Sequence, residues 1–475
     1  MPIWGVSAEP RRCRYLGLAG SVMLALGGLG AGAVPLGTPH APTGPGIFLA
    51  WCGMVLLIAA WLLLGRAVRG AEPPEPRWLL RTLLCWAAPL VLGPPLFSRD
   101  VYSYLAQGAL VGAGLNAYTT GPAALGGPFD AQVPGLWQHT PAPYGPLFLL
   151  LADLVARVAG HALSAGVLLL RLVALGGLAL LAVVLPRLAR ACGVPPAAAL
   201  WLGLLNPLVL FHLVAGAHND ALLLALLVSG LLLRRRPLWA AVLVTLAALI
   251  KLPAALGLVA VVVLWGERLK GRAGLSRAAL ATGAVALATT AVVTALSGIG
   301  YGWVHALAVP VSAGSWSLTS LLGRACGWLL SSLYHSTEVG LVGLAVLAWR
   351  WLGLAAAVAS VLLLLRRVRR RQVGVVYAVG LALVAVVALG PAIRPWYALW
   401  GGVLIAAAAP ADGRVRRWAP LVSGLLALLV APDGFTPGPQ EVLLAVAGGV
   451  LGAVVVLAGV RIPLPRLTEK PMGRM

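Results

Sequence analysis

Long apolar runs, most of them separated by short polar connections, constrain the fold of this chain more than any other feature of its sequence. A helix needs about 20 apolar residues to cross a bilayer. Candidate runs lie at 16–36, 47–65, 79–97, 163–186, 198–216, 219–233, 276–297, 341–365, 373–390, 396–410, 418–432 and 441–460. Only 10% of the residues are charged, against roughly 25% in soluble domains, which excludes a water-soluble globular fold. The pattern predicts an all-α polytopic membrane protein, with a single integral membrane domain over 1–475.

The run 238–265 is ambiguous because Lys251-Leu252-Pro253 divides it into two halves. As one helix it would rise about 42 Å, which is too long for one crossing. Basic clusters flank it on both sides: Arg234, Arg235 and Arg236 before, and Arg268, Lys270 and Arg272 after. Because the positive-inside rule assigns both flanks to the cytoplasm, we expect a helical hairpin with Lys251 at its outer tip. The topology then has about 12–14 membrane helices and two cytoplasmic termini.

The basic residues follow this topology. All but seven of the 35 lysines and arginines fall in the predicted cytoplasmic segments, as the positive-inside rule requires. The exceptions are Arg99, Arg157, Arg171, Lys251, Arg324, Arg350 and Arg394. The net charge of +22 does not indicate nucleic-acid binding, because the basic residues stand between apolar runs. The short cytoplasmic connections contain no Gly-rich phosphate loop, which argues against an ATP-driven transporter.

Two long segments, 98–162 and 298–340, face outward in this topology, and the first opens with Ser98-Arg99-Asp100. Ser98 suits an N-cap, which puts Asp100 in a first helical turn, where the helix dipole favours a carboxylate. Spacings of four and three put Tyr104 and Gln107 on the same face. A carboxylate just outside the membrane suits a general base acting on a sugar hydroxyl, so Asp100 is the candidate catalytic residue. Tyr102, Tyr104 and Gln107 are candidates for substrate binding, and a purely capping aspartate is the alternative.

The rest of this outer loop has the composition of a sugar-binding site. Its aromatic and polar residues include Tyr118, Tyr144, Trp137, Gln138, His139, Asn116 and Asp130. Aromatic faces pack against the apolar faces of sugar rings, while amides and carboxylates bond their hydroxyls. Tyr144, in the rigid turn 141–146, is therefore another candidate for substrate binding. An aromatic belt at the membrane interface is the alternative.

A second polar cluster, His218-Asn219-Asp220, lies in a short outer turn between two predicted helices. We expect His218 and Asp220 to reach the same cavity as Asp100 and bind substrate, although Asn219 and Asp220 also suit helix capping. The seven histidines contain no HxxxH or HxH pair and the five cysteines no CxxC pair, so neither a metal site nor a cofactor nor a disulfide framework is expected. A divalent cation held by Asp100 and Asp220 stays open as an alternative.

Two cations stand on the outer side against the charge rule: Lys251 at the hairpin tip and Arg394 in Arg394-Pro395-Trp396-Tyr397. Cations at such positions need an anionic partner, and we expect them to bind a lipid-linked phosphate. Snorkelling to lipid headgroups is the alternative. Trp396 and Tyr397 are expected to bind substrate beside Arg394. Arg171 and Arg350 fall inside predicted spans, either as buried functional cations or because the helix ends are drawn wrongly.

An outward carboxylate, an aromatic polar loop and outer cations fit transfer of a sugar from a polyprenyl phosphate. The membrane would hold the isoprenoid, and the cations would stabilise the departing phosphate. Because a phosphate leaving group needs no proton, one carboxylate base suffices for an inverting displacement, unlike the carboxylate pair of a glycoside hydrolase.

Several motifs in order resemble those of a known family. They are Ser98-Arg99-Asp100-Val101-Tyr102-Ser103-Tyr104, Gly114-Leu115-Asn116-Ala117-Tyr118, Pro143-Tyr144-Gly145-Pro146, Gly216-Ala217-His218-Asn219-Asp220, Lys251-Leu252-Pro253 and Arg394-Pro395-Trp396-Tyr397. Over 90–400 the chain resembles the actinobacterial polyprenol-phosphomannose-dependent α-1,6-mannosyltransferases. The resemblance implies a GT-C glycosyltransferase of the bacterial plasma membrane, with a periplasmic site and a catalytic aspartate that matches Asp100. It implies a polyprenyl-phosphate mannose donor and a lipid-anchored α-1,6-mannan acceptor, the core of lipomannan and lipoarabinomannan.

Other functions stay open at this stage. Within the same fold, the donor sugar could be arabinose or glucose, because one sequence does not define the sugar pocket. A lipid-sugar transporter or flippase is the alternative from another class; its binding groups would lie near the bilayer midplane, whereas the polar residues here gather in outer loops. A purely structural scaffold would not explain the composition of the loop 98–162.

Overall fold

The computed structural model describes residues 9–35, 43–269, 271, 273–308, 315–333, 339–434 and 438–461, which form helices and connections without a strand. This confirms the all-α fold. The α-helices are α1 (Pro10–Ala31), α2 (Gly44–Val68), α3 (Pro76–Leu92), α4 (Asp100–Gly112), α5 (Gly135–Gln138), α6 (Pro146–Ala159), α7 (Leu163–Ala191), α8 (Pro196–Gly203), α9 (Asp220–Leu232), α10 (Pro237–Ala248), α11 (Leu256–Leu269), α12 (Gly274–Ser297), α13 (Leu318–Leu333), α14 (Val339–Arg369), α15 (Val375–Leu389), α16 (Ala398–Ala408), α17 (Arg414–Ala427) and α18 (Pro439–Arg461). Short 3-10 turns are η2 (Pro122–Ala124), η3 (Asp130–Gln132), η5 (Leu252–Ala255), η6 (Gly302–Ala308) and η7 (Pro395–Tyr397), and η4 (Val209–Ala215) is π-helical.

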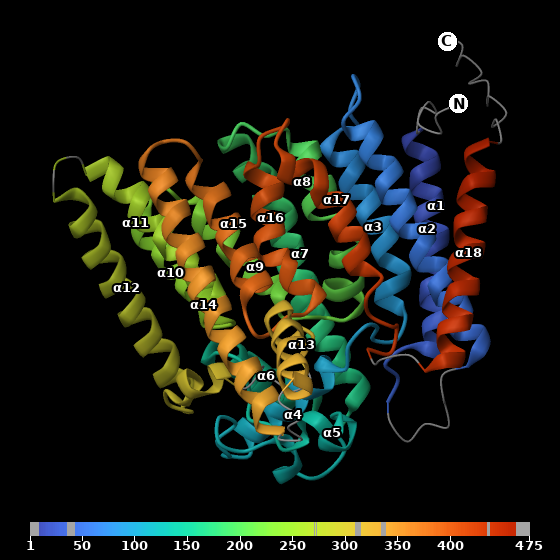
Figure 1. Cartoon of the computed structure of the whole chain (residues 1–475), viewed down its shortest axis with the longest axis horizontal. Coiled ribbons are helices and arrows are strands. Elements are labelled where there is room, and N and C mark those ends of the chain that lie inside the picture. The colour runs from blue at the N-terminus through green and yellow to red at the C-terminus, as the bar shows by residue number, and fades with distance from the viewer. Residues whose placement is uncertain are drawn as a thin grey trace, which may run out of the picture.

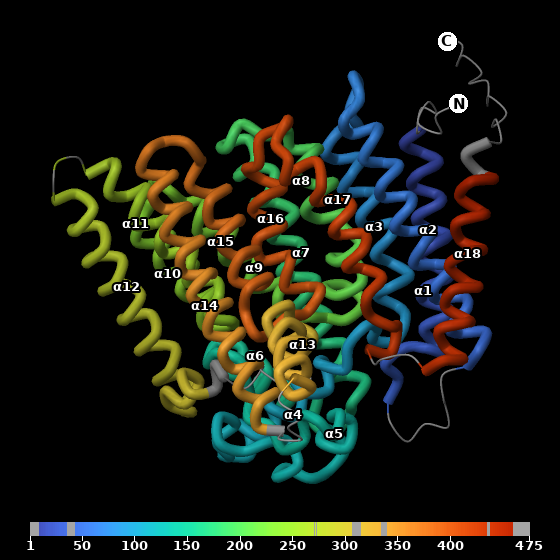
Figure 2. The backbone as a smooth tube through the Cα atoms, in the orientation of Figure 1, coloured from blue at the N-terminus to red at the C-terminus, as the bar shows by residue number. Residues whose placement is uncertain are grey.

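The two ends of the helical bundle differ in structure (Figure 1). At the upper end of the view, α1 begins, α18 ends, and the connections α2–α3, α14–α15 and α16–α17 turn. At the lower end, α4, α5 and α6 gather with the irregular segment that joins them. The backbone trace in Figure 2 follows the same course. The segment 98–162 therefore lies at the end of the bundle away from the start of α1.

The described helices make this a multi-pass membrane protein. Seven of them are long and apolar enough to cross a membrane, or eight if the bent pair η4 and α9 counts as one broken span. Three shorter apolar helices accompany them, at Pro237–Ala248, Val375–Leu389 and Pro395–Ala408. The described residues thus contain fewer full-length membrane helices than the roughly 12–14 that the sequence predicts.

Backbone breaks explain much of this difference. The run 198–216, expected as one span, is divided: α8 ends at Gly203, and η4 begins only after Asn206 and Pro207. Proline cannot donate the backbone hydrogen bond that would continue a helix, and the Asn206 side chain accepts from the backbone N–H of Leu208 (3.0 Å) instead. After η4 the chain bends by 110° into α9.

The run 238–265 is divided as expected. α10 and α11 lie on either side of Lys251 and pack against each other. Arg268, at the end of α11, donates to the carbonyl of Arg234 (3.0 Å), which precedes α10, so the two flanks of the hairpin meet. Lys270 and Arg272 of the second flank lie outside the described residues.

The segment 298–340, expected as a long outer loop, contains a helix. α13 packs along α14, with Gly323 close to Val346 and Gly327 close to Val342. Small residues four apart let two helices approach closely, which is the signal that the sequence analysis missed. Residues 309–314 and 334–338 of this segment lie outside the described part of the chain.

Arg171 lies within α7, so its position in a span did not come from a wrongly drawn helix end. It is 5% exposed, and its guanidinium donates to the carbonyls of Val91 (2.6 Å), Gly93 (2.9 Å) and Ala215 (3.3 Å). These carbonyls end α3 and η4, where a helix leaves acceptors unsatisfied. Arg171 therefore links α7 to the ends of α3 and η4.

We expect Arg171→Met to lower the free energy of unfolding by about 3 kcal/mol or more, because charged hydrogen bonds are worth about 1.5–3 kcal/mol each. Denaturant titration in detergent micelles measures the loss. Arg187→Met is the matched control, because Arg187 is exposed on the same helix and donates to Val183 within that helix. Equal stability of the two variants would contradict a tying role for Arg171.

Candidate functional site

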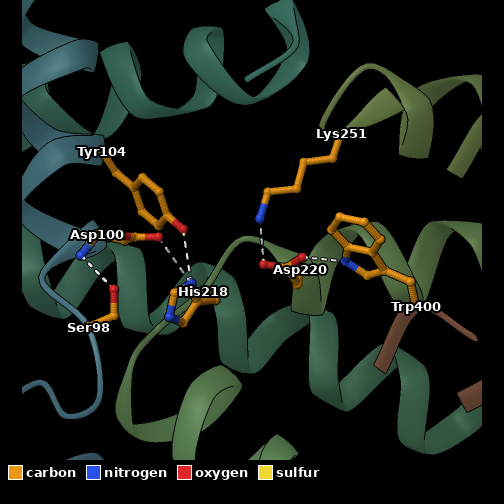
Figure 3. Close-up of polar contacts among 7 residues, drawn as sticks. All are labelled: Ser98, Asp100, Tyr104, His218, Asp220, Lys251 and Trp400. Carbon is orange, nitrogen blue, oxygen red and sulfur yellow. Dashed lines mark hydrogen bonds and ion pairs between the residues drawn. The ribbon is translucent and has the colours of Figure 1, made fainter. Parts of the chain in front are cut away.

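A buried ion pair joins two of the polar motifs. The ammonium of Lys251 lies 2.7 Å from Oδ2 of Asp220, and the indole N–H of Trp400 donates to Oδ1 of the same carboxylate (2.6 Å). The Asp220 residue is fully buried and Lys251 is 8% exposed. Figure 3 shows Lys251 and Trp400 converging on Asp220 from different segments. Lys251 thus lies at the tip of the hairpin between α10 and α11, and its charge is balanced by Asp220.

Three aromatic rings surround the same ammonium. Nζ of Lys251 lies 5.3 Å from the ring centre of Tyr397, 5.5 Å from that of Tyr144 and 5.9 Å from that of Trp400. Tyr397 and Trp400 stack on each other with ring centres 4.2 Å apart. A cation within about 6 Å of a ring centre is attracted to its face. Lys251 therefore contacts the turn 143–146 through Tyr144, η7 through Tyr397 and α16 through Trp400.

The hairpin tip also docks on the turn 143–146 through its backbone. The N–H of Gly145 donates to the carbonyl of Ile250 (3.0 Å), and that of Leu147 to the carbonyl of Leu249 (3.2 Å). A side chain at Gly145 would collide with the Leu249 backbone. Glycine is therefore required in this turn, because only a backbone without Cβ can approach so closely.

Asp100 begins α4 as the sequence suggested, with a small change in the cap. The hydroxyl of Ser98 accepts from the N–H of Asp100 (3.0 Å), and Arg99 occupies the N-cap position. The Asp100 side chain is 25% exposed, which leaves the carboxylate reachable from the cavity.

His218, which does not line the cavity, lies beside Asp100 and Tyr104 (Figure 3). Nδ1 of His218 is 3.6 Å from Oδ2 of Asp100 and 3.2 Å from the hydroxyl of Tyr104. Burial raises the pKa of Tyr104 well above the usual tyrosine range, so the phenol stays protonated and can donate to Nδ1. Burial likewise raises the pKa of Tyr144, whose ring packs edge-on to Tyr104. With Nδ1 accepting from Tyr104, the imidazole packs against the Asp100 carboxylate at 3.6 Å without a hydrogen bond to it.

Both segments that carry this cluster enter it through a residue in the left-handed backbone region. Phe97 has φ 64° just before Ser98, and Ala217 has φ 52° just before His218. Non-glycine residues rarely adopt this conformation, and such strain concentrates at functional sites. Phe97 is held by stacking on Phe211, with ring centres 4.7 Å apart.

A large cavity of about 1210 Å³ opens in front of Asp100. Its polar lining includes Asp100, Gln107, Lys251 and Arg394, and its aromatic lining Tyr144, Trp396 and Tyr397. The cavity also runs along α14, which contributes Leu347, Arg350, Trp351, Leu354, Ala357, Val358, Val361 and Leu362. One space therefore joins a polar end to a long apolar wall.

Four of the candidate residues do not line this cavity. Tyr102 is buried and its hydroxyl donates to the carbonyl of Ala33 (2.7 Å). Tyr104, His218 and Asp220 are buried behind the lining, in the contacts described above. Viewed down the axis of a helix with 3.6 residues per turn, Ser103 (i+3) and Gln107 (i+7) are rotated from Asp100 in one direction, and Tyr104 (i+4) is rotated in the other. Ser103 and Gln107 therefore face the cavity with Asp100, and Tyr104 does not.

Several lining residues escaped the sequence analysis or had no role assigned. Ser103 could have been found from the same helical spacing, and Trp400 from its spacing of four from Trp396. In the sequence Arg350 stands out only as a charge within a predicted span; in the structure its Nε donates to the hydroxyl of Ser320 (3.0 Å). No sequence signal distinguishes the apolar wall of α14 from any other membrane helix.

The arrangement bears on the divalent-cation alternative. Lys251 and Trp400 each bind one oxygen of the buried Asp220 carboxylate, so the ammonium already balances the charge that Asp220 would offer a divalent cation. Within the described residues, no group of three or more His, Cys, Asp or Glu side chains is arranged to hold a metal ion.

Comparison with known proteins decides the family. Residues 14–267 match the family described as "Alpha-(1->6)-mannopyranosyltransferase, N-terminal domain", and residues 320–458 match the one described as "MptB C-terminal domain". The chain belongs to the alpha-(1->6)-mannopyranosyltransferase family. It is a glycosyltransferase of the hexosyltransferase class, and its activity is mannosyl transfer.

Relatives of this mannosyltransferase cover nearly all of its chain. A probable alpha-(1->6)-mannopyranosyltransferase of Mycolicibacterium smegmatis is 35% identical over 97% of this chain and 90% of its own length. Alpha-(1->6)-mannopyranosyltransferase A of Mycobacterium tuberculosis is 37% identical over 88% and 84%. Alpha-(1->6)-mannopyranosyltransferase B of Corynebacterium glutamicum is 31% identical over 83% and 72%. No solved structure matches the mannosyltransferase, so the GT-C fold stays an expectation.

We expect Lys251→Met to destabilise the mannosyltransferase by about 3–5 kcal/mol, because it leaves the buried Asp220 carboxylate without its counter-charge. Adding Asp220→Asn removes that charge while keeping an acceptor for Trp400, so the double variant should recover part of the loss. Denaturant titration in micelles measures both.

The matched control is Glu9→Gln, which breaks the exposed pair with Arg12 and should cost about 1 kcal/mol or less. Native stability of Lys251→Met together with weakened donor binding would instead make Lys251 a phosphate ligand.

Proposed function

We propose that the enzyme transfers mannose from polyprenyl-phosphate mannose to the 6-hydroxyl of a lipid-anchored α-1,6-mannan, the core of lipomannan and lipoarabinomannan. The proposed reaction takes place at the outer face of the bacterial plasma membrane. One observation carries this proposal: a single cavity is lined by a carboxylate, by arginines and by a long apolar helix face. A lipid-linked sugar phosphate presents the three matching parts.

The apolar wall suits the isoprenoid. The lining residues of α14 run from Leu347 to Leu362, a rise of about 22 Å along a helix. They belong to one of the candidate membrane spans. Trp351, Val358 and Leu362 are each at least 59% exposed, so a chain in the bilayer can lie against them and bury apolar surface.

The arginines suit the phosphate. Within the described residues Arg394 forms no ion pair with a carboxylate, whereas Lys251 is paired with Asp220. Arg350 lines the same cavity from α14, between Leu347 and Trp351. An arginine fork binds phosphate oxygens through two parallel hydrogen bonds. In this proposal Arg394 is the main phosphate ligand and Arg350 is a second one. Lys251 has a structural role, because it pairs with Asp220 and contacts the aromatic rings of the cavity wall.

Asp100 is the proposed general base. The 6-hydroxyl oxygen of the acceptor attacks the anomeric carbon of the donor, and its proton passes to the Asp100 carboxylate. The bond between that carbon and the phosphate oxygen breaks, and polyprenyl phosphate leaves with the electron pair. Arg394 stabilises the charge that develops on the phosphate. The Ser98 hydroxyl, which accepts from the backbone N–H of Asp100, fixes the first turn of α4 and with it the position of Asp100.

A single displacement of this kind inverts the anomeric centre. An α-linked product, which the names of the relatives imply, then requires a donor in which mannose is β-linked to phosphate. Tyr144, Trp396 and Tyr397 line the cavity beside Lys251 and Arg394 and would contact the sugar in this proposal, since aromatic faces pack against sugar rings.

The outer location rests on charge. Arginines cluster in the connections α2–α3, α14–α15 and α16–α17 or in the helix ends beside them; these connections turn at one end of the bundle, and α4 lies at the other. Because lysine and arginine are retained on the cytoplasmic side, the end that carries Asp100 would face outward.

Asp100→Asn should lower kcat about 10²–10⁴-fold, because the amide cannot accept the proton of the attacking hydroxyl. The assay is mannose transfer by the purified protein from polyprenyl-phosphate mannose to a synthetic α-1,6-mannoside, run with and without chelator. Asp130→Asn, in the same outer loop but outside the cavity lining, should keep native activity. Near-native transfer by Asp100→Asn would remove Asp100 from the mechanism.

Arg394→Gln should raise the KM for the donor about 10- to 100-fold, the cost of losing a charged hydrogen-bond pair to phosphate. Arg157→Gln, an outer arginine outside the lining, is the control. Offering polyprenyl-phosphate arabinose and glucose alongside the mannose donor tests the sugar assignment, and faster transfer of either would overturn it.

A further inference from the structure

Two buried polar atoms face the cavity beside Asp100 without a partner. Ser103 is 6% exposed and Gln107 is 3% exposed, and both line the cavity. Among the described residues, neither Oγ of Ser103 nor Oε1 of Gln107 has a hydrogen-bond partner. Buried polar atoms are nearly always satisfied in native proteins, so this pair calls for a ligand that brings hydrogen-bonding groups.

The spacing of these residues indicates that a ligand would lie along the axis of α4. Asp100, Ser103 and Gln107 stand at positions i, i+3 and i+7 of α4, along one helix face. The distance from the first to the last is about 10 Å along the helix axis, which exceeds the width of a single sugar ring. A ligand that follows this face from Asp100 would therefore extend beyond one sugar.

The loop after α4 adds an aromatic side chain to the same cavity. Trp137 of α5 lines it and is partly buried, and Thr140 lines it just after α5. The wall is held in place because the hydroxyl of Thr140 donates to the carbonyl of Leu136 (2.9 Å) and the N–H of Ala142 donates to that of Ala117 (2.8 Å). An indole face beside hydroxyl and amide groups is suited to a neutral sugar.

We propose that Ser103, Gln107 and Trp137 form a subsite for the acceptor, which binds the mannose residue preceding the one that receives the new sugar. The proposal rests on the function given above. The acceptor's terminal mannose lies at Asp100, and the next residue along the chain lies against Ser103 and Gln107, with its ring on Trp137.

Charge distinguishes this subsite from the donor site. The side chains of Ser103, Gln107, Trp137 and Thr140 are all neutral, and a mannan is neutral as well. The donor carries a phosphate and a lipid, which match the arginines and the apolar wall of α14 that line the cavity elsewhere. The cavity thus provides separate surfaces for the two substrates.

The test uses the purified full chain with synthetic α-1,6-linked mannosides of one, two and three residues and a constant donor. Gln107→Met keeps the volume of the side chain and removes its hydrogen bonds, and should raise the KM for the two- and three-residue acceptors about 5-fold. Trp137→Ala should raise it about 10-fold. Both variants should use the one-residue acceptor as the wild type does, with an unchanged donor KM. Leu136→Ala is the control, because Leu136 neighbours Trp137 on α5 but is 65% exposed and outside the lining.

The outcomes separate the subsite from the proposed function. Equal losses for all acceptor lengths, or a raised donor KM, would overturn the subsite. Absence of transfer by the wild-type protein would overturn the proposed function instead, and saturation-transfer NMR with α-1,6-mannotriose then tests the subsite alone. Binding to the wild type that is lost in Gln107→Met and Trp137→Ala supports it, and equal binding to all three proteins contradicts it.

Discussion

The buried contact between Lys251 and Asp220 holds the rest of the site together. Removing two charges from water is costly, and the attraction between them compensates only when the geometry is good and the remaining polar groups are satisfied. Here the ammonium lies 2.7 Å from the carboxylate, the indole of Trp400 binds the second oxygen, and three aromatic rings enclose the cation. Motifs that lie far apart in the chain are thereby fixed around one cavity.

The pair also sets the balance of charge around the cavity. With Lys251 balanced inside the protein, Arg394 and Arg350 supply positive charge to the cavity, and Asp100 supplies a reachable carboxylate. His218 contacts Asp100, and Asp220, two residues further on, holds Lys251, so the short turn 218–220 links the proposed base to the cavity wall that carries Lys251. The proposed division of labour follows: cations and an apolar helix for a lipid phosphate, neutral groups along α4 for a second sugar.

Much of the fold could be predicted because apolar periodicity and the distribution of arginine depend on the bilayer alone. The hairpin around Lys251 followed from its basic flanks, and the helix that begins at Asp100 followed from Ser98. What could not be predicted depends on packing between distant segments. The partner of Lys251 lies 31 residues away, the hydroxyl of Tyr102 turns to Ala33, and the breaks that divide 198–216 and the helix α13 reflect local backbone contacts. The wall formed by α14 is invisible in sequence, because every membrane helix carries apolar side chains.

The most direct test of the central claim is an experimental structure of the protein with a non-transferable donor, a polyprenyl phosphonate that carries mannose. The account predicts the phosphonate within hydrogen-bond distance of Arg394, the anomeric carbon facing the carboxylate of Asp100, and the prenyl chain lying against α14. Density for the sugar remote from Asp100, or for the lipid at the end of the bundle where α1 begins, would contradict it.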